Sequence, residues 1–151
     1  MAGDALEIDE LVVRDHRKRC YHYLWVAVSR VTRQVLGFVI GDRSYKSLWK
    51  LWFSLPSDYR RKLVYSDFYE VYAAFFRPWQ HRACDKGSGQ TSLVEGLNNK
   101  WRNRVSGLVR KTVCVQHEPD LEKRLLLVMQ EHNQQCRQQV EKLDGLIIPT
   151  P

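Results

Sequence analysis

The sequence has 151 residues, a net charge of +7 and 44% hydrophobic residues. This length and composition are typical of one compact domain with a packed core, and they argue against a disordered tail or a fibrous protein. The basic balance favours a polyanionic partner, either a nucleic acid or an anionic membrane surface. The acidic start of the chain does not have the pattern of a signal peptide, and no apolar run reaches the roughly 20 residues of a membrane helix. We therefore expect a cytoplasmic protein that does not span a membrane.

The first part of the chain predicts three strands. The segment Leu6–Val13 is apolar with interleaved acids, Tyr21–Ser29 is dense in aromatic and β-branched residues, and Gln34–Gly41 is mostly apolar. The polar, basic breaks between these segments have the length of hairpin loops. The simplest assembly is an antiparallel three-stranded meander.

After residue 41 the apolar residues repeat at intervals of three and four, as in Leu48, Leu51, Trp52 and Leu55, and helices alternate with short strands. In chain order we expect a helix from Ser44 to Leu55, a strand at Lys62–Tyr65, a helix at Phe68–Phe76 and a short strand at Gln80–Cys84. This order predicts an α/β fold.

Two further helices complete the predicted structure. The first begins at Ser92, its expected N-cap, and runs to about Leu108, whereas the last begins near Pro119 and stops at Gly145. We expect an α/β domain over residues 1–118. A long amphipathic helix over residues 119–145 should pack on this domain or extend it, and a tail should follow at residues 146–151.

Three acids occupy positions that suit catalysis. Asp9 lies inside the first predicted strand, Asp67 at the carboxyl end of the fourth, and Glu95 near the start of the third predicted helix. The carboxyl ends of strands and the helix starts that follow them form the usual functional rim of an α/β sheet. Carboxylates that converge there would bind Mg²⁺, and two such ions about 3.5 to 4 Å apart support phosphodiester chemistry.

Each acid also has a structural interpretation. Asp67 could cap the helix that follows it, and Glu95 could complete a capping box by reaching back to the Ser92 amide. For these two acids, taken singly, capping is the simpler interpretation. Asp9 could be a solvated residue on a sheet edge, although Asp is disfavoured inside strands, so both of its interpretations stay open.

A basic segment follows Glu95. Residues 96–117 contain five basic residues and no acid. A solvated helix face usually carries charges of both signs, so the missing acids favour contact with phosphates over simple solvation. Helical spacing also places Asn98, Asn99 and Arg102 on the face of Glu95. This face is opposite the stripe of Leu97 and Trp101. The candidate DNA-binding residues are Lys100, Arg102, Arg104, Arg110, Lys111, Asn98 and Asn99.

Seven short blocks keep their order between Glu7 and Thr112. They are Glu7–Leu11, Tyr23–Trp25, Ile40–Ser44, Ser66–Tyr72, Gly89–Glu95, Leu97–Asn99 and Arg104–Thr112. In these blocks the chain resembles the transposases of the insertion-element-one family (InsB type). The resemblance implies a ribonuclease-H-like fold, with a mixed sheet, an antiparallel three-stranded meander and flanking helices. It also implies D-D-E chemistry, with Asp9, Asp67 and Glu95 as the catalytic, metal-binding acids.

The same resemblance implies an activity and its partners. The expected reaction uses two metal ions, either Mg²⁺ or Mn²⁺. Hydrolysis frees a 3′-hydroxyl at the end of an insertion sequence, and this hydroxyl then attacks target DNA. The substrates are double-stranded element ends and target, bound by a homo-oligomer. His81 and Lys86 fall where the family tends to carry a His and a Lys, so we expect them to line the site.

The DNA-recognition part of such a transposase is not found in this sequence, because only eight residues precede Asp9. We therefore expect a zinc-binding and helix-turn-helix region to be supplied by fusion or by a partner protein. Two alternatives stay open. The chain could be a truncated or repurposed remnant that binds DNA without cutting it, or a standalone nuclease of the same fold.

Overall fold

The computed structural model describes residues 3–14, 21–104 and 118–146. Within these residues five strands form one sheet in the order β3-β2-β1-β4-β5. The strands are β1 (Ala5–Arg14), β2 (Tyr21–Ser29), β3 (Val35–Gly41), β4 (Leu63–Ser66) and β5 (His81–Ala83). The first three pair antiparallel, whereas β4 runs parallel to β1 and β5 parallel to β4. The predicted meander is confirmed, and the two short strands extend the sheet beyond β1.

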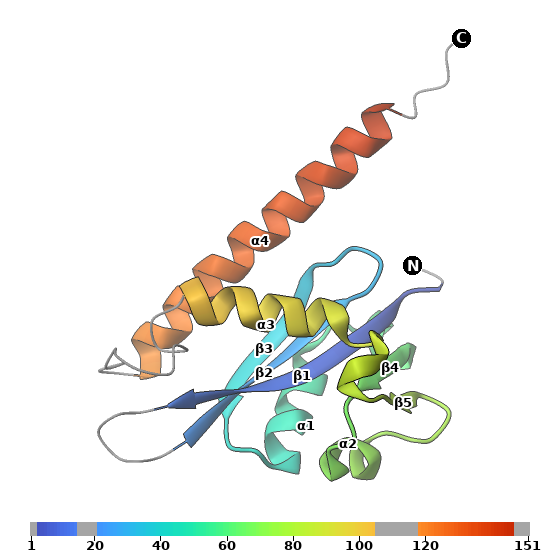
Figure 1. The fold of residues 1–151 in the computed structure, drawn as a ribbon, viewed down its shortest axis with the longest axis vertical. Helices are drawn as coiled ribbons and strands as arrows, with labels where there is room; N and C mark the ends of the chain where they lie inside the picture. The colour runs from blue at the N-terminus through green and yellow to red at the C-terminus, as the bar shows by residue number, and fades with distance from the viewer. Residues whose placement is uncertain (1–2, 15–20, 105–117, 147–151) are drawn as a thin grey trace.

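Helices cover both faces of this sheet (Figure 1). The described helices are α1 (Tyr45–Ser54), α2 (Glu70–Phe75), α3 (Ser92–Arg104) and α4 (Glu118–Leu146), with short 3₁₀ helices η1 (Ser57–Arg61) and η2 (Lys86–Ser88). The core against α1 and α2 contains Leu48 and Tyr72, and the core against α3 and α4 contains Trp101 and Leu125. The sheet is therefore the middle layer of three.

Strand β1 supplies side chains to both cores because successive residues of a strand point to opposite faces. Leu6 and Ile8 pack in the core of α1 and α2, whereas Leu11 and Val13 pack in the core of α3 and α4. The α3 face of β1 carries an acid, Asp9, two residues before Leu11. An acid is thus placed at the centre of the sheet, beneath a helix.

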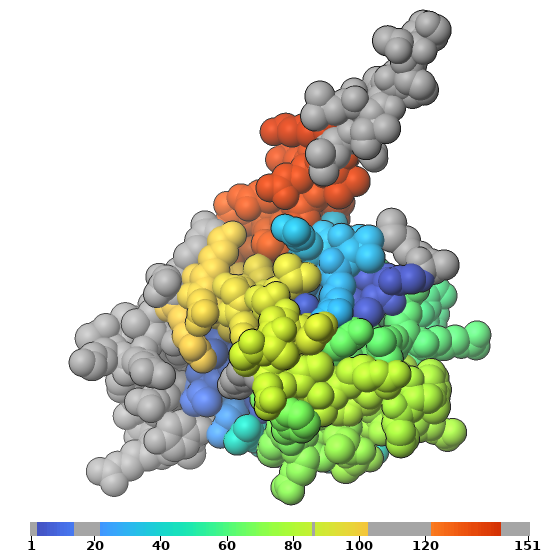
Figure 2. Space-filling view, turned by 45° about the vertical axis from the view of Figure 1, so that its right-hand side comes forward, coloured from blue at the N-terminus to red at the C-terminus, as the bar shows by residue number. Residues whose placement is uncertain are grey.

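Helix α4 is joined to the edge strand β3 by hydrogen bonds. The Asn133 side chain accepts from the Val35 amide at 2.8 Å and donates to the Val35 carbonyl at 2.9 Å. Arg33, in the turn before β3, has a positive φ of 61°, and its carbonyl accepts from the His132 ring at 2.9 Å. Beyond these contacts α4 projects well past the sheet (Figures 1 and 2).

Three predicted element ends are wrong. Helix α2 begins at Glu70 rather than Phe68, because the Asp67 carboxylate accepts from the Tyr69 amide and holds the chain in a turn. Helix α3 already includes Ser92, which is therefore not its N-cap. Helix α4 continues to Leu146, so Gly145 lies inside the last turn instead of ending it.

The mixed five-stranded sheet with flanking helices confirms the predicted ribonuclease-H-like fold. Within the described part of the chain, no helix combines the length and the apolar character that a membrane crossing requires.

Candidate active site

Three carboxylates converge where β4 ends beside β1. Asp9, Glu10 and Asp67 each offer an oxygen, and these oxygens lie within 4.8 Å of one another. The pairing of β4 with β1 extends only to Glu7 and Tyr65, so β4 ends before it reaches Asp9. Asp67, the residue after β4, therefore meets the uncovered edge of β1. The structure thus brings together two of the three predicted acids, Asp9 and Asp67.

The third acid of this cluster is Glu10, which the sequence analysis missed. Its carboxylate accepts a hydrogen bond from the buried Tyr72 hydroxyl and pairs with the Arg43 guanidinium at 3.0 Å. Burial raises the pKa of Glu10, the negative charge of Asp67 raises it further, and the hydrogen bonds from Tyr72 and Arg43 oppose the shift. Both carboxylate oxygens of Glu10 therefore already have a hydrogen-bond partner.

Asp9 is held from the opposite face by α3. The Asn98 side-chain amide donates to Asp9 Oδ2 at 2.9 Å. Asn98 is buried, together with Val94, Leu97 and Trp101, so the buried face of α3 is wider than the predicted apolar stripe. The prediction that Asn98 lies on the face opposite this stripe is wrong. Its amide oxygen has no hydrogen-bond partner among the described residues, and its amide nitrogen orients Asp9.

Glu7 fixes the start of α3 above β1. Its buried carboxylate accepts from the Val94 amide at 2.9 Å, in the first turn of α3, and pairs with Arg30 at 3.2 Å. Burial raises the pKa of Glu7, and the contacts with Val94 and Arg30 partly offset the rise. The Arg30 guanidinium also stacks on the Tyr65 ring at 3.4 Å. Glu7 therefore positions α3, the helix whose Asn98 side chain contacts Asp9.

Glu95 lies outside the acid cluster. Its carboxylate accepts from the Thr91 hydroxyl at 2.7 Å, so the predicted capping contact with the Ser92 amide is not the contact that it makes. Glu95 is one turn before Asn98 on α3, on the helix that contacts Asp9. The interpretation of Asp67 as the cap of the following helix is wrong, because Tyr69 is the N-cap of α2 and Asp67 binds the Tyr69 amide in the turn before it.

His81, in β5, contacts Ser66, the residue before Asp67. Its Nε2 atom is 2.6 Å from the Ser66 hydroxyl, and this hydroxyl donates to the Asp67 carbonyl at 3.0 Å. Burial lowers the pKa of His81, and the nearby charge of Arg82 lowers it further. The side chain of Lys86 lies outside the described residues.

The donor set of the cluster fits a hard divalent cation. Mg²⁺ and Mn²⁺ prefer oxygen ligands, and carboxylates are the usual ones in proteins. Three carboxylate oxygens within 4.8 Å of one another repel each other strongly when ionised. A bound cation would remove this repulsion, so Asp9 and Asp67, with Glu10 beside them, form a candidate metal site.

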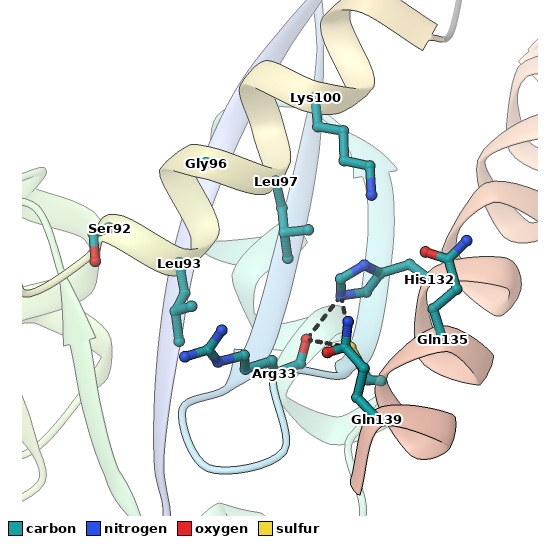
Figure 3. Close-up of a pocket in the computed structure, with 10 residues that line it drawn as sticks. Arg33, Ser92, Leu93, Gly96, Leu97, Lys100, His132, Gln135 and Gln139 are labelled. Carbon is teal, nitrogen blue, oxygen red and sulfur yellow. Dashed lines mark hydrogen bonds between the residues drawn. The ribbon is translucent and has the colours of Figure 1, made fainter. Parts of the chain in front are cut away.

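The predicted DNA-binding residues are only partly described. Lys100 is exposed and points into a pocket of about 340 Å³ between α3 and α4, toward the His132 ring (Figure 3). Arg102 lies near the exposed Asn99, at 3.4 Å between guanidinium and amide oxygen. The Arg104 side chain, Arg110 and Lys111 lie outside the described residues. The exposed end of α3 is therefore polar and basic where it is described.

The residues that the sequence analysis missed left a weak signal. Glu7 and Glu10 flank Asp9 in the run Glu7–Glu10, which alternates charged and apolar residues only in part. The run showed that acids gather in β1, but the contacts of Glu10 with Tyr72 and Arg43 join residues up to 62 positions apart. Such contacts are set by the packing of α2 and the β3–α1 connection against β1.

A comparison with protein families gives a match over most of the chain. The model of the family described as IS1 transposase matches residues 5–143. No curated protein matches the chain. The matched region includes the whole sheet, the acid cluster, α3 and most of α4.

Proposed function

Because the chain belongs to the IS1 transposase family, we propose that Asp9, Asp67 and Glu95 are the catalytic acids of metal-dependent DNA strand cleavage and strand transfer. Membership in this family supports a DNA-binding, DNA-processing enzyme of transposition, a form of DNA recombination that moves insertion sequences. The observation that carries the catalytic proposal is the convergence of Asp9 and Asp67 at the end of β4.

Asp9 and Asp67 would hold the metal ions in this proposal. Bound there, two Mg²⁺ or Mn²⁺ ions would activate the attacking oxygen and stabilise the departing one. Asn98 keeps the Asp9 carboxylate oriented, and the Asp67 carboxylate is anchored by the Tyr69 amide. Such contacts around metal-binding carboxylates set both their direction and their basicity.

The role of Glu95 is supported by the family resemblance and by its place on α3. In the structure its carboxylate binds Thr91, so joining the cluster requires the side chain to leave that hydroxyl. Helix α3 already reaches Asp9 through Asn98, one turn beyond Glu95. Glu10 is the other candidate for the third acid, because its oxygen is already in the cluster.

DNA would be held by the basic part of the chain that follows Glu95. Lys100, Arg102 and the exposed Asn99 support this proposal, because they lie on the same helix as Glu95 and Asn98. Cationic side chains bind the phosphate backbone without reading its sequence. The proposal includes Arg104, Arg110 and Lys111 in this surface, and His81 and Lys86 as lining of the site.

The proposed partners follow the family pattern. The substrates would be double-stranded element ends and target DNA, processed by a homo-oligomer. Recognition of the ends would come from a zinc-binding and helix-turn-helix region supplied by fusion or by a partner protein. A non-cutting DNA-binding remnant and a standalone nuclease are the alternatives that the following experiment separates.

The test is cleavage of supercoiled plasmid by the full chain with Mg²⁺ or Mn²⁺. The wild type should nick the plasmid, whereas Asp67→Asn should lose nicking by at least about a hundredfold while it still binds DNA in a gel-shift assay. Glu70→Gln, which removes an exposed acid nearby, is the matched control and should nick normally. Equal nicking by the wild type and Asp67→Asn would overturn the catalytic proposal.

The same assay decides the third acid and the alternatives. Glu95→Gln should abolish nicking, and Glu10→Gln should reduce it less if Glu95 is the catalytic acid. The reverse order would assign the third position to Glu10. Joining of a labelled 3′-end to target DNA would support a transposase, and hydrolysis without joining would support a nuclease.

A further inference from the structure

A group of exposed aromatic side chains lies on the side of the sheet that faces away from α3 and α4. Helix α1 carries Tyr45, Trp49 and Phe53 at intervals of four residues, on the face opposite its buried leucines. The exposed Trp79, before β5, and the half-buried Phe75, at the end of α2, line the same groove. We call these five residues the aromatic patch; they line a groove of about 440 Å³.

Four of the five residues of the aromatic patch are exposed: Tyr45, Trp49, Phe53 and Trp79. Trp49 is 50% exposed and Trp79 is 61% exposed, and neither is needed to fill the core below. Single exposed apolar residues are ordinary, but a group drawn from several elements marks an interaction surface. The Trp49 and Phe53 rings contact each other with centroids 4.8 Å apart, so they present a joint ring surface.

Three arginines border the same groove: Arg60, Arg61 and Arg77. No acidic residue is among the described residues that line it, and none of the three arginines forms an ion pair with another described residue. The Arg60 guanidinium lies 5.5 Å from the centre of the Phe53 ring. The groove therefore combines ring faces with uncompensated positive charge.

The positive charge of the groove argues against a second copy of the chain as its occupant. A second copy of the chain, bound through a two-fold axis, would bring the same surface against itself. The three arginines would then face three others with no acid between them, which opposes association. An anionic occupant has the complementary charge.

The ring faces narrow the choice of anion. In duplex DNA the base faces are stacked inside the helix and cannot be reached by side chains, whereas a single strand offers both bases and phosphates. Proteins that bind single strands combine stacking aromatic residues with a positively charged groove. We propose that the aromatic patch and its arginines bind single-stranded DNA, with bases stacked on Trp49 and Trp79 and phosphates held by Arg61 and Arg77.

This site is separate from the acid cluster, and its binding needs no metal ion. The test is fluorescence anisotropy of a labelled twelve-nucleotide oligo-dT with the full chain in EDTA, beside a duplex of the same length. The double variant Trp49→Leu/Trp79→Leu keeps apolar side chains but removes the rings, and it should bind the oligonucleotide at least about tenfold more weakly. Its duplex affinity should change much less.

Three further variants complete the test: one that keeps a ring, one that removes two arginines, and one control. Trp79→Phe keeps a ring and should retain most of the affinity even if the leucine variant fails to fold. Arg61→Gln/Arg77→Gln should lower the slope of log affinity against log salt by about 0.7 for each phosphate that is no longer bound. Leu127→Ala, at an exposed position of α4, should bind like the wild type.

Unchanged oligonucleotide affinity in the folded leucine variant would overturn the proposal, and so would an equal loss of single-strand and duplex binding. Sedimentation gives a second decisive measurement. Self-association that the leucine variant abolishes, with single-strand binding intact, would assign the patch to a second copy and overturn the proposal. Plasmid nicking, scored separately, tests the acid cluster and not this site.

Discussion

At the scale of single residues, the site depends on side chains that hold the acids as much as on the acids themselves. Asp9 would bind metal in a direction set by Asn98, whose amide donates to it at 2.9 Å. Glu10 sits in the same cluster, but Tyr72 and Arg43 already occupy its two oxygens. The carboxylates of Asp9 and Glu10 therefore have different hydrogen-bond partners, because different helices pack on the two faces of β1.

Asn98→Ala should weaken metal binding without removing a metal ligand. We expect a loss of about 10- to 100-fold in Mn²⁺ affinity, since the Asp9 carboxylate would no longer be oriented. Isothermal titration calorimetry in the absence of DNA measures this change. Asn99→Ala, at the exposed neighbouring position, is the control. Identical affinities of the two variants would show that Asn98 does not position Asp9.

Asp4 gives a pH-dependent contribution to stability that is independent of the site. Burial would raise its pKa, but hydrogen bonds from the Ser29 hydroxyl and the Val31 and Ala5 amides outweigh burial and lower the pKa below its ordinary value of 3.8. A lowered pKa in the folded state stabilises the fold above pH 3.8, and this stabilisation is lost as pH falls through the folded-state value.

We therefore expect Asp4→Asn to reduce the free energy of unfolding by about 1 kcal/mol at neutral pH. The difference from the wild type should shrink progressively below pH 3.8. Urea unfolding at a series of pH values measures it, with the exposed Asp58→Asn as control. A difference that stayed constant down to the lowest pH would contradict the role of the ionised carboxylate.

At the scale of elements, α3 and α4 reach the sheet through polar contacts as well as apolar packing. Glu7 binds the first turn of α3, and Asn133 of α4 binds both backbone groups of Val35 on the edge strand β3. Without such a partner these groups on β3 would be left without protein hydrogen bonds, as is usual at a sheet edge. The two helices thereby acquire fixed positions relative to β1.

Asn133→Ala should loosen α4 from the sheet. The Val35 amide and carbonyl would lose their partners, so we expect the free energy of unfolding to fall by about 1 to 3 kcal/mol. Faster hydrogen exchange of the Val35 amide would report the local change. Gln134→Ala, one residue further along and exposed, is the matched control. Unaltered exchange at Val35 would mean that apolar packing alone holds α4.

At the scale of the whole molecule, the acid cluster lies apart from Lys100 and from the arginines that border the aromatic patch. The acid cluster is at the end of β4, Lys100 is on α3, and the three arginines of the aromatic patch lie on the opposite layer. Among the described residues, positive charge therefore lies on α3 and along the groove of the aromatic patch, apart from the acid cluster. Such a distribution draws a polyanion to the molecule while it leaves a place for cations.

Divalent metal should stabilise the folded protein through this acidic site. At a concentration 100 times the dissociation constant, binding adds about 2.7 kcal/mol to the free energy of unfolding. Thermal unfolding with MnCl₂ and with EDTA, compared at equal ionic strength, measures the effect. Asp67→Asn should show little increase with MnCl₂. An equal increase in wild type and Asp67→Asn would place the metal elsewhere.

The local sequence was sufficient to predict most of the elements. The alternating pattern of residues 6–13 predicted β1, and Leu48 with Leu51 and Trp52 predicted the buried face of α1. These predictions succeed because strand and helix periods are local properties. The start of α2 was wrong, since the side chain of Asp67 takes the Tyr69 amide and competes with the helix.

The sequence by itself determined that Asp9 lies in the first strand and that Asp67 follows the fourth. Strand periodicity and the order of elements can be predicted from neighbouring residues. Only the tertiary structure decided which acids converge. It added Glu10, placed Asn98 on the buried face of α3 and left Glu95 on Thr91. The physical reason is that these contacts join residues from different elements, and their distances depend on how β4, α2 and α3 pack against β1.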